Sequence, residues 1–157
     1  MSRVDGKARA CLKDALIKYM TLEMSSYTFD EITTEVSNTS DDSVRRISGI
    51  LYFLYDDTID HAISVSPNDW ATLRRLIAFL ATDLEIRTTE KRDPWPFANA
   101  DEWNAHECFL SEIGLPDYDP EVHGRQVHSW WSRIPIGVGL VLLFAIVVAV
   151  TVVLIQS

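Results

Sequence analysis

The sequence is organised around one stretch, SPNDWATLRRLIAFLATDLEI, which occupies residues 66–86. Ser66, Pro67 and Asp69 form a helix-start signal, because serine can cap a first turn, proline fits the first helical position and the acid completes a capping box. The centre, LIAFLA at 76–81, is apolar on nearly every side. A helix of this kind is stable only when other helices surround it. The stretch therefore predicts a long buried helix, from Pro67 through the quoted residues, at the centre of a bundle.

Three other helical patterns flank this stretch. In each of them apolar residues recur at i, i+3 and i+4, as on the buried face of an amphipathic helix. They predict helices over 7–24, from Asp41 or Asp42 to about residue 60, and over 100–113, the last ended by Gly114. Polar, turn-rich loops are predicted at 35–43 and 87–96. No segment alternates between apolar and polar residues for long enough to predict a strand, so the sequence predicts an all-α fold.

A second apolar stretch lies near the end of the sequence. Residues 134–155 read IPIGVGLVLLFAIVVAVTVVLI, 22 residues without a charge. As a helix this segment is about 33 Å long, which matches a bilayer core of about 30 Å. It predicts a transmembrane anchor from Ile134 to Ile155, with Trp130 and Trp131 at the level of the lipid headgroups.

These patterns predict a cytosolic helical bundle over 1–116, a polar linker over 117–133 and the anchor over 134–155. Two residues follow the anchor in the sequence, and the first twenty residues lack the apolar run of a signal peptide. We therefore expect insertion after translation, with the bundle facing the cytosol. Ala145 and Ala149 form a small-xxx-small pair, through which the anchors of two copies could pair as a homodimer.

Composition argues against several functional classes. The chain has 157 residues with 23 acidic and 14 basic side chains, a formal net charge of −9, which disfavours binding to nucleic acid. Glu102, His106 and Cys108 lie close in sequence, but their spacing matches no known metal pattern. No set of residues fills the roles of nucleophile, base and oxyanion donor. The sequence thus predicts no enzyme, no metal and no cofactor.

The remaining prediction is that the bundle binds a partner protein. A small helical bundle can hold a groove that accepts a partner helix through apolar anchors. An arginine beside such a groove can bind a ligand carboxylate through two parallel hydrogen bonds. Four arginines are candidates, and the alternative for each is an ordinary surface side chain: Arg45, Arg46, Arg74 and Arg75.

Four segments, in this order, resemble the B-cell lymphoma two (Bcl) family of apoptosis regulators, especially its short viral members. DALIKY at 14–19, continuing through SYTF at 26–29, resembles the first helix and fourth homology region, and VRRISGIL at 44–51 the third region. NDWATLRRLIAFLA at 68–81 resembles the first region, and WPFANADEW at 95–103, continuing through Phe109, the second. The apolar anchor is also typical of the family.

Three departures from the family pattern stand out. Gly49 replaces the aspartate of the third region, and Ala71 and Thr72 interrupt the signature of the first. The intervals from Val44 to Asn68 and from Trp70 to Trp103 are each about one helix shorter than in the family. The resemblance therefore implies a Bcl-like bundle that is truncated.

The resemblance implies a tail-anchored apoptosis regulator. A member that promotes cell death would share the same segments, and the imperfect third region favours an inhibitor. It would bind the amphipathic death helix of pro-apoptotic Bcl proteins at the outer mitochondrial or endoplasmic reticulum membrane, with Arg74 or Arg75 pairing to the ligand's aspartate. The residues that would line the groove are Leu51, Leu54, Tyr55, Leu73, Ile77 and Phe79. The rival reading is a tail-anchored adaptor or viral single-pass membrane protein with a small acidic helical head and no such groove.

Overall fold

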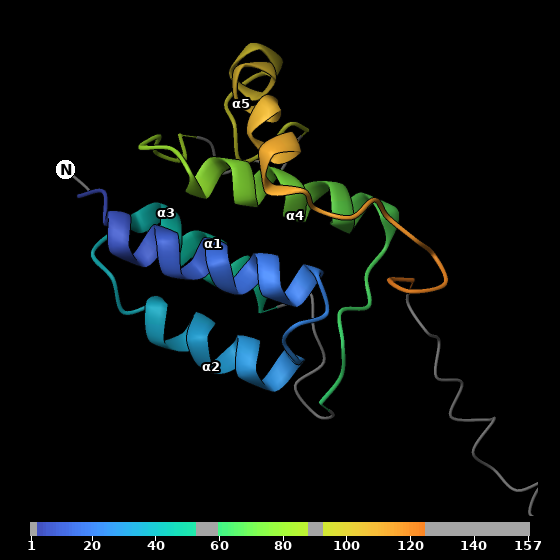
Figure 1. Cartoon of the computed structure of the whole chain (residues 1–157). Helices are drawn as coiled ribbons and strands as arrows, with labels where there is room; N and C mark the ends of the chain where they lie inside the picture. The colour runs from blue at the N-terminus through green and yellow to red at the C-terminus, as the bar shows by residue number, and fades with distance from the viewer. Residues whose placement is uncertain (1–2, 53–59, 88–92, 125–157) are drawn as a thin grey trace, which may run out of the picture. The chain divides into compact units, whose positions relative to one another are not determined.

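The computed structural model describes residues 3–52, 60–87 and 93–124 (Figure 1). Every regular element in these ranges is an α-helix, which confirms the all-α prediction. The helices are α1 (Gly6–Met20), α2 (Ser26–Val36), α3 (Asp42–Leu51), α4 (Pro67–Leu80) and α5 (Ala100–Ile113).

Helix α4 packs against α1 on one side and α5 on the other (Figure 1), whereas α1 is the helix that contacts three others, α2, α3 and α4. Its capping box forms as predicted: the Ser66 hydroxyl accepts from the Asp69 N–H at 3.2 Å, and the Asp69 carboxylate accepts from the Ser66 N–H at 3.3 Å. Ala78 and Leu80 would be exposed if no other helix packed around this segment, and both are buried. The apolar character of this helix is therefore explained by burial between two layers.

The predicted length of α4 is wrong, because the helix ends at Leu80 instead of continuing to Ile86. The Thr82 hydroxyl donates to the Phe79 carbonyl at 2.8 Å, and the Thr82 N–H donates to the same carbonyl. Such local bonds compete with the i to i−4 pattern of a helix. Residues 83–87 have no regular secondary structure, and the Ile86 N–H donates to the Ser43 hydroxyl at the start of α3.

The N-terminal half differs from the prediction of one helix over 7–24 and a loop over 35–43. A turn at Leu22 ends α1, and α2 extends to Val36. Helix α2 is rich in threonine, whose helix propensity is low, so its helical form depends on packing. That packing includes the stacked rings of Tyr19 and Phe29, 4.6 Å apart, which no local pattern predicts.

The direction of each helix follows from one set of contacts. Arg9, near the start of α1, bonds to Asp41 just before α3 and to Thr82 just after α4. Consequently α1 and α3 run in one direction and α4 in the other, and the short turn at 21–25 makes α2 antiparallel to α1. We call the end that contains Arg9, Asp41 and Thr82 the clasp end (Figure 1).

Helix α5 has the bounds predicted from the sequence. The Asn99 side chain caps its start by accepting from the Glu102 N–H at 2.9 Å. Gly114 ends it in the left-handed conformation, with φ 69°, which glycine adopts at little cost. The preceding turn brings Phe97 against Phe79 of α4, with ring centroids 5.6 Å apart.

The segment 115–124 contains the first residues of the predicted polar linker over 117–133. It packs along the start of α4, where the ring of His123 lies 4.2 Å from that of Trp70. His123 is buried, and its carbonyl accepts from the Val65 N–H at 2.9 Å. The compact unit that contains these contacts spans Met1–Arg125.

No helix within 3–52, 60–87 and 93–124 combines the length and apolarity needed to cross a bilayer. The predicted span from Ile134 to Ile155, with Trp130 and Trp131, lies outside the described residues and stays a prediction.

Candidate functional site

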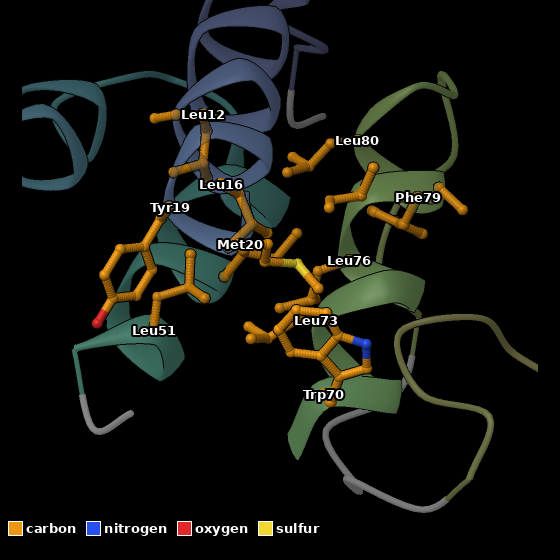
Figure 2. Close-up of a cluster of buried hydrophobic side chains, with 14 of the residues drawn as sticks. Leu12, Leu16, Tyr19, Met20, Leu51, Trp70, Leu73, Leu76, Phe79 and Leu80 are labelled. Carbon is orange, nitrogen blue, oxygen red and sulfur yellow. The ribbon is translucent and has the colours of Figure 1, made fainter. Parts of the chain in front are cut away.

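The predicted groove residues on α3 and α4 belong to the core. Leu51, Leu73, Ile77 and Phe79 are each at most 2% exposed, and Figure 2 shows three of them among the side chains of α1, α3 and α4. They do not line an open surface in this structure, because α1 and α5 cover the two sides of α4. Leu54 and Tyr55 lie outside the described residues.

The two arginines of α4 have different environments. Arg75 is only 16% exposed, pairs with Asp93 and donates to the Thr72 hydroxyl at 3.3 Å. Arg74 is 31% exposed, and its guanidinium lies 3.6 Å from the fully exposed carboxylate of Asp117. Of the two arginines on α4, Arg74 is therefore the one that a ligand can reach. On α3, Arg45 and Arg46 are both exposed, and Arg45 pairs with Asp42.

Trp70 lies beneath the segment 115–124, which we call the covering segment. Besides His123, the ring of Tyr118 packs edge-on against Trp70 with centroids 6.0 Å apart, and the Tyr118 hydroxyl donates to the Val65 carbonyl at 3.2 Å. The indole N–H of Trp70 is buried without a hydrogen-bond partner. A buried donor left unpaired costs free energy, so this position would gain from an acceptor.

One face of α4 thus combines an aromatic ring, apolar side chains and a cation. Trp70, Leu73, Arg74 and Ile77 follow the i, i+3, i+4, i+7 spacing that places side chains on a common helix face. The covering segment lies over the first turns of this face, through Asp117 on Arg74 and Tyr118 on Trp70. We call these residues, with the covering segment, the α4 site.

A second polar cluster, at the clasp end, was not predicted. Arg9 is buried, and its Nε donates to the Asp41 carboxylate at 2.7 Å while a second nitrogen donates to the Thr82 carbonyl at 2.5 Å. The Asp41 carboxylate also caps α3 by accepting from the N–H groups of Ser43 and Val44. The signal available in the sequence was the place of Arg9 on the apolar stripe of α1, in register with Leu12. An arginine at such a position needs a buried partner.

The Asp41 carboxylate makes the free energy of unfolding depend on pH in the acidic range. Burial by itself would raise the pKa of Asp41, but hydrogen bonds from Arg9 and from the Asp5 N–H outweigh it and hold the pKa below the ordinary value of 3.8. A lowered folded-state pKa stabilises the fold above the unfolded value, and this contribution is lost as pH falls through the folded value. We expect urea unfolding at a series of pH values to show stability falling below about pH 3.8.

The control for this acid dependence is the double variant Arg9→Met, Asp41→Asn, which has no titrating group at position 41. Its stability should fall less steeply in the same pH range. The pKa values of Asp5 and Asp60 are also lowered by hydrogen bonds, and these two groups account for the pH dependence of the unfolding free energy that remains. Equal slopes in the two proteins would contradict the assignment to Asp41.

Among the residues that the structure describes, no group of three or more histidine, cysteine or acidic side chains could hold a metal ion. Glu102, His106 and Cys108 share helix α5, but the ring of His106 bonds to the backbone carbonyl of Glu102 at 2.8 Å. Cys11 and Cys108 are exposed free thiols.

No family model, curated protein or solved structure matches this chain. The four segments quoted in the sequence analysis fall on different helices of the structure. Residues 14–29 extend from α1 into α2, 44–51 lie in α3, 68–81 lead through α4, and 95–109 enter α5.

Proposed function

We propose that this chain is a tail-anchored inhibitor of apoptosis that binds the amphipathic death helix of pro-apoptotic Bcl proteins. The observation that supports the proposal is the α4 site, where Arg74 is 31% exposed on a helix that has seven of its fourteen residues buried. Its position agrees with the expectation that an arginine of this segment pairs with the aspartate of the ligand.

Arg74 can exchange its carboxylate partner at little cost. Asp117 is fully exposed and 3.6 Å away, and an ion pair in solvent contributes little stability. A carboxylate on a docked helix would be shielded from water and could accept two parallel hydrogen bonds, which makes a stronger and more directional contact. The ligand's aspartate would therefore replace Asp117.

The covering segment would move when the partner binds. It contacts the start of α4 through Tyr118 and His123, and these aromatic contacts occupy the surface that an apolar residue of the partner would use. With the segment displaced, Trp70 would become the first anchor point, and Leu73 and Ile77 would extend the contact along the same face. Leu73 and Ile77, two of the predicted groove residues on α4, would thus form the floor of the site in the opened state, whereas Phe79 packs against Phe97.

The test is fluorescence anisotropy of labelled death-helix peptides titrated with the full chain in lipid nanodiscs. Arg74→Glu places like charge opposite the ligand aspartate, and we expect it to weaken binding at least tenfold, or about 1.4 kcal/mol. Arg46→Glu makes the same charge change on an exposed arginine of α3 and should leave the affinity unchanged. In cells, the wild-type chain should protect against a pro-apoptotic protein and the Arg74→Glu variant should not.

A tail-anchored adaptor without a death-helix groove is the second candidate, favoured by the burial of Leu51, Leu73, Ile77 and Phe79. In that case no peptide of the panel binds at micromolar concentrations. Equal losses for Arg74→Glu and Arg46→Glu would likewise exclude the α4 site, because they would reflect net charge alone.

A further inference from the structure

Four large hydrophobic side chains are exposed on the described part of the chain. They are between 44% and 51% exposed, far above the core residues. Single exposed apolar residues are common, but several gathered at one place mark an interaction surface. The four are Leu22, Tyr27, Tyr52 and Val122.

All four lie at the end of the bundle opposite the clasp end. Leu22 follows the end of α1, Tyr27 begins α2 and Tyr52 follows the end of α3, and the helix directions place these termini together (Figure 1). Val122 joins them through the residues that precede α4: the Ser26 N–H donates to the His61 carbonyl, and the Val65 N–H to the His123 carbonyl. We call this the exit end, because Gly124, the last described residue, lies there and accepts from the Ser64 hydroxyl.

Leu22 occupies a position that local structure would give to glycine. The Glu23 N–H donates to the Lys18 carbonyl at 2.8 Å, and the Leu22 N–H to the Tyr19 carbonyl at 3.3 Å, which is the Schellman pattern of a helix end. Leu22 therefore has φ 64°, a conformation that disfavours a leucine. The Leu22 side chain is 46% exposed, so its burial within the bundle does not offset this backbone strain.

In the sequence, the predicted membrane span follows closely after the exit end. Nine residues, 125–133, separate Gly124 from Ile134, and even a fully extended chain of that length reaches only about 30 Å. If the span is inserted, the exposed residues of the exit end are held close to the bilayer surface. A tether this short strongly favours a second contact with the same membrane.

We propose that the exit end docks on the surface of the bilayer that holds the predicted 134–155 span, with Leu22, Tyr27, Tyr52 and Val122 at the boundary between headgroups and acyl chains. This inference rests on the membrane anchor of the proposed function. Tyrosine suits the boundary because its ring is apolar and its hydroxyl polar. Glu23, Asp60 and Glu121 are exposed at the same end. Because anionic lipids would repel these carboxylates, the proposed docking surface is a bilayer of zwitterionic lipids.

The test uses the full chain, with Cys11 and Cys108 replaced by serine, in phosphatidylcholine vesicles. A single cysteine at position 22 or 122 is labelled with an environment-sensitive fluorophore, and lipids brominated near the headgroup serve as quenchers. The matched control is Ser40→Cys, an exposed position beside Asp41 at the clasp end. We expect at least twofold quenching at 22 and 122 and none at 40.

Further variants separate docking from folding. Leu22→Gly removes the apolar side chain and suits the positive φ, so Leu22→Gly with Tyr27→Ser should keep the helical circular dichroism and reduce quenching at position 122 by half or more. Vesicles containing a fifth of anionic lipid should also show weaker quenching.

Flotation of the vesicles with bound protein and no quenching at 22 or 122 overturns the docking but leaves the anchor intact. Failure to float overturns both. If the fluorescence of the labels changes with the density of protein in the vesicles but is not quenched by brominated lipid, this end contacts a second copy of the chain. That result would also overturn the proposal.

Discussion

Replacing Arg9 with methionine is expected to lower the free energy of unfolding by about 3–5 kcal/mol, because it leaves the buried Asp41 carboxylate without its counter-ion. The guanidinium also donates to the Thr82 carbonyl and lies 5.6 Å from the ring centroid of Phe79. The change therefore weakens contacts among α1, α3 and α4 at once. Urea unfolding followed by circular dichroism measures the loss.

Two controls define the origin of this effect. Asparagine at position 41 is neutral and can still cap α3, so the Arg9→Met, Asp41→Asn double variant should be more stable than Arg9→Met alone. Arg45→Ala breaks an exposed pair with Asp42 and should change stability by less than about 0.5 kcal/mol. A double variant as unstable as Arg9→Met would show that lost packing, rather than an unpaired charge, dominates.

Replacing Phe79 with alanine is expected to cost about 3–5 kcal/mol, because it opens a cavity where α4 meets the turn before α5. Phe79 is fully buried and packs edge-on against Phe97. Thermal unfolding should show a large decrease in Tm for Phe79→Ala and a smaller one for Phe79→Leu, which keeps more of the apolar volume.

This variant also distinguishes a core residue from an exposed groove residue. If Phe79 lined an open groove, alanine would abolish peptide binding while leaving Tm nearly unchanged. The structure predicts the reverse order of effects: the fold is weakened first, and binding is lost only as a consequence of unfolding.

The sequence was informative where a signal is local. The capping box of Ser66 and Asp69, the N-terminal acid before α3 and the Gly114 terminator each act within a few residues, and each appears at the predicted place. The apolar centre of α4 also required burial on several sides, whatever surrounds it.

Contacts between distant segments explain the differences. The hydroxyl of Thr82 ends α4 early, and α2 depends on Tyr19 stacking on Phe29. The residues that lead out of α5 appeared polar enough for a linker, yet Tyr118 and His123 pack on Trp70. Periodicity reports how one helix distributes its apolar residues, but it does not report which segment supplies the opposite surface.

The α4 site shows the same division. The sequence by itself determined that Arg74 and Arg75 lie beside apolar residues on one helix. Only the tertiary structure decided that Arg75 pairs with Asp93 while Arg74 pairs with the fully exposed Asp117, and that Arg9 and Asp41 form a buried pair. The physical reason is that helix formation is governed by neighbouring residues, whereas the exposure and pairing of a charge depend on segments tens of residues away.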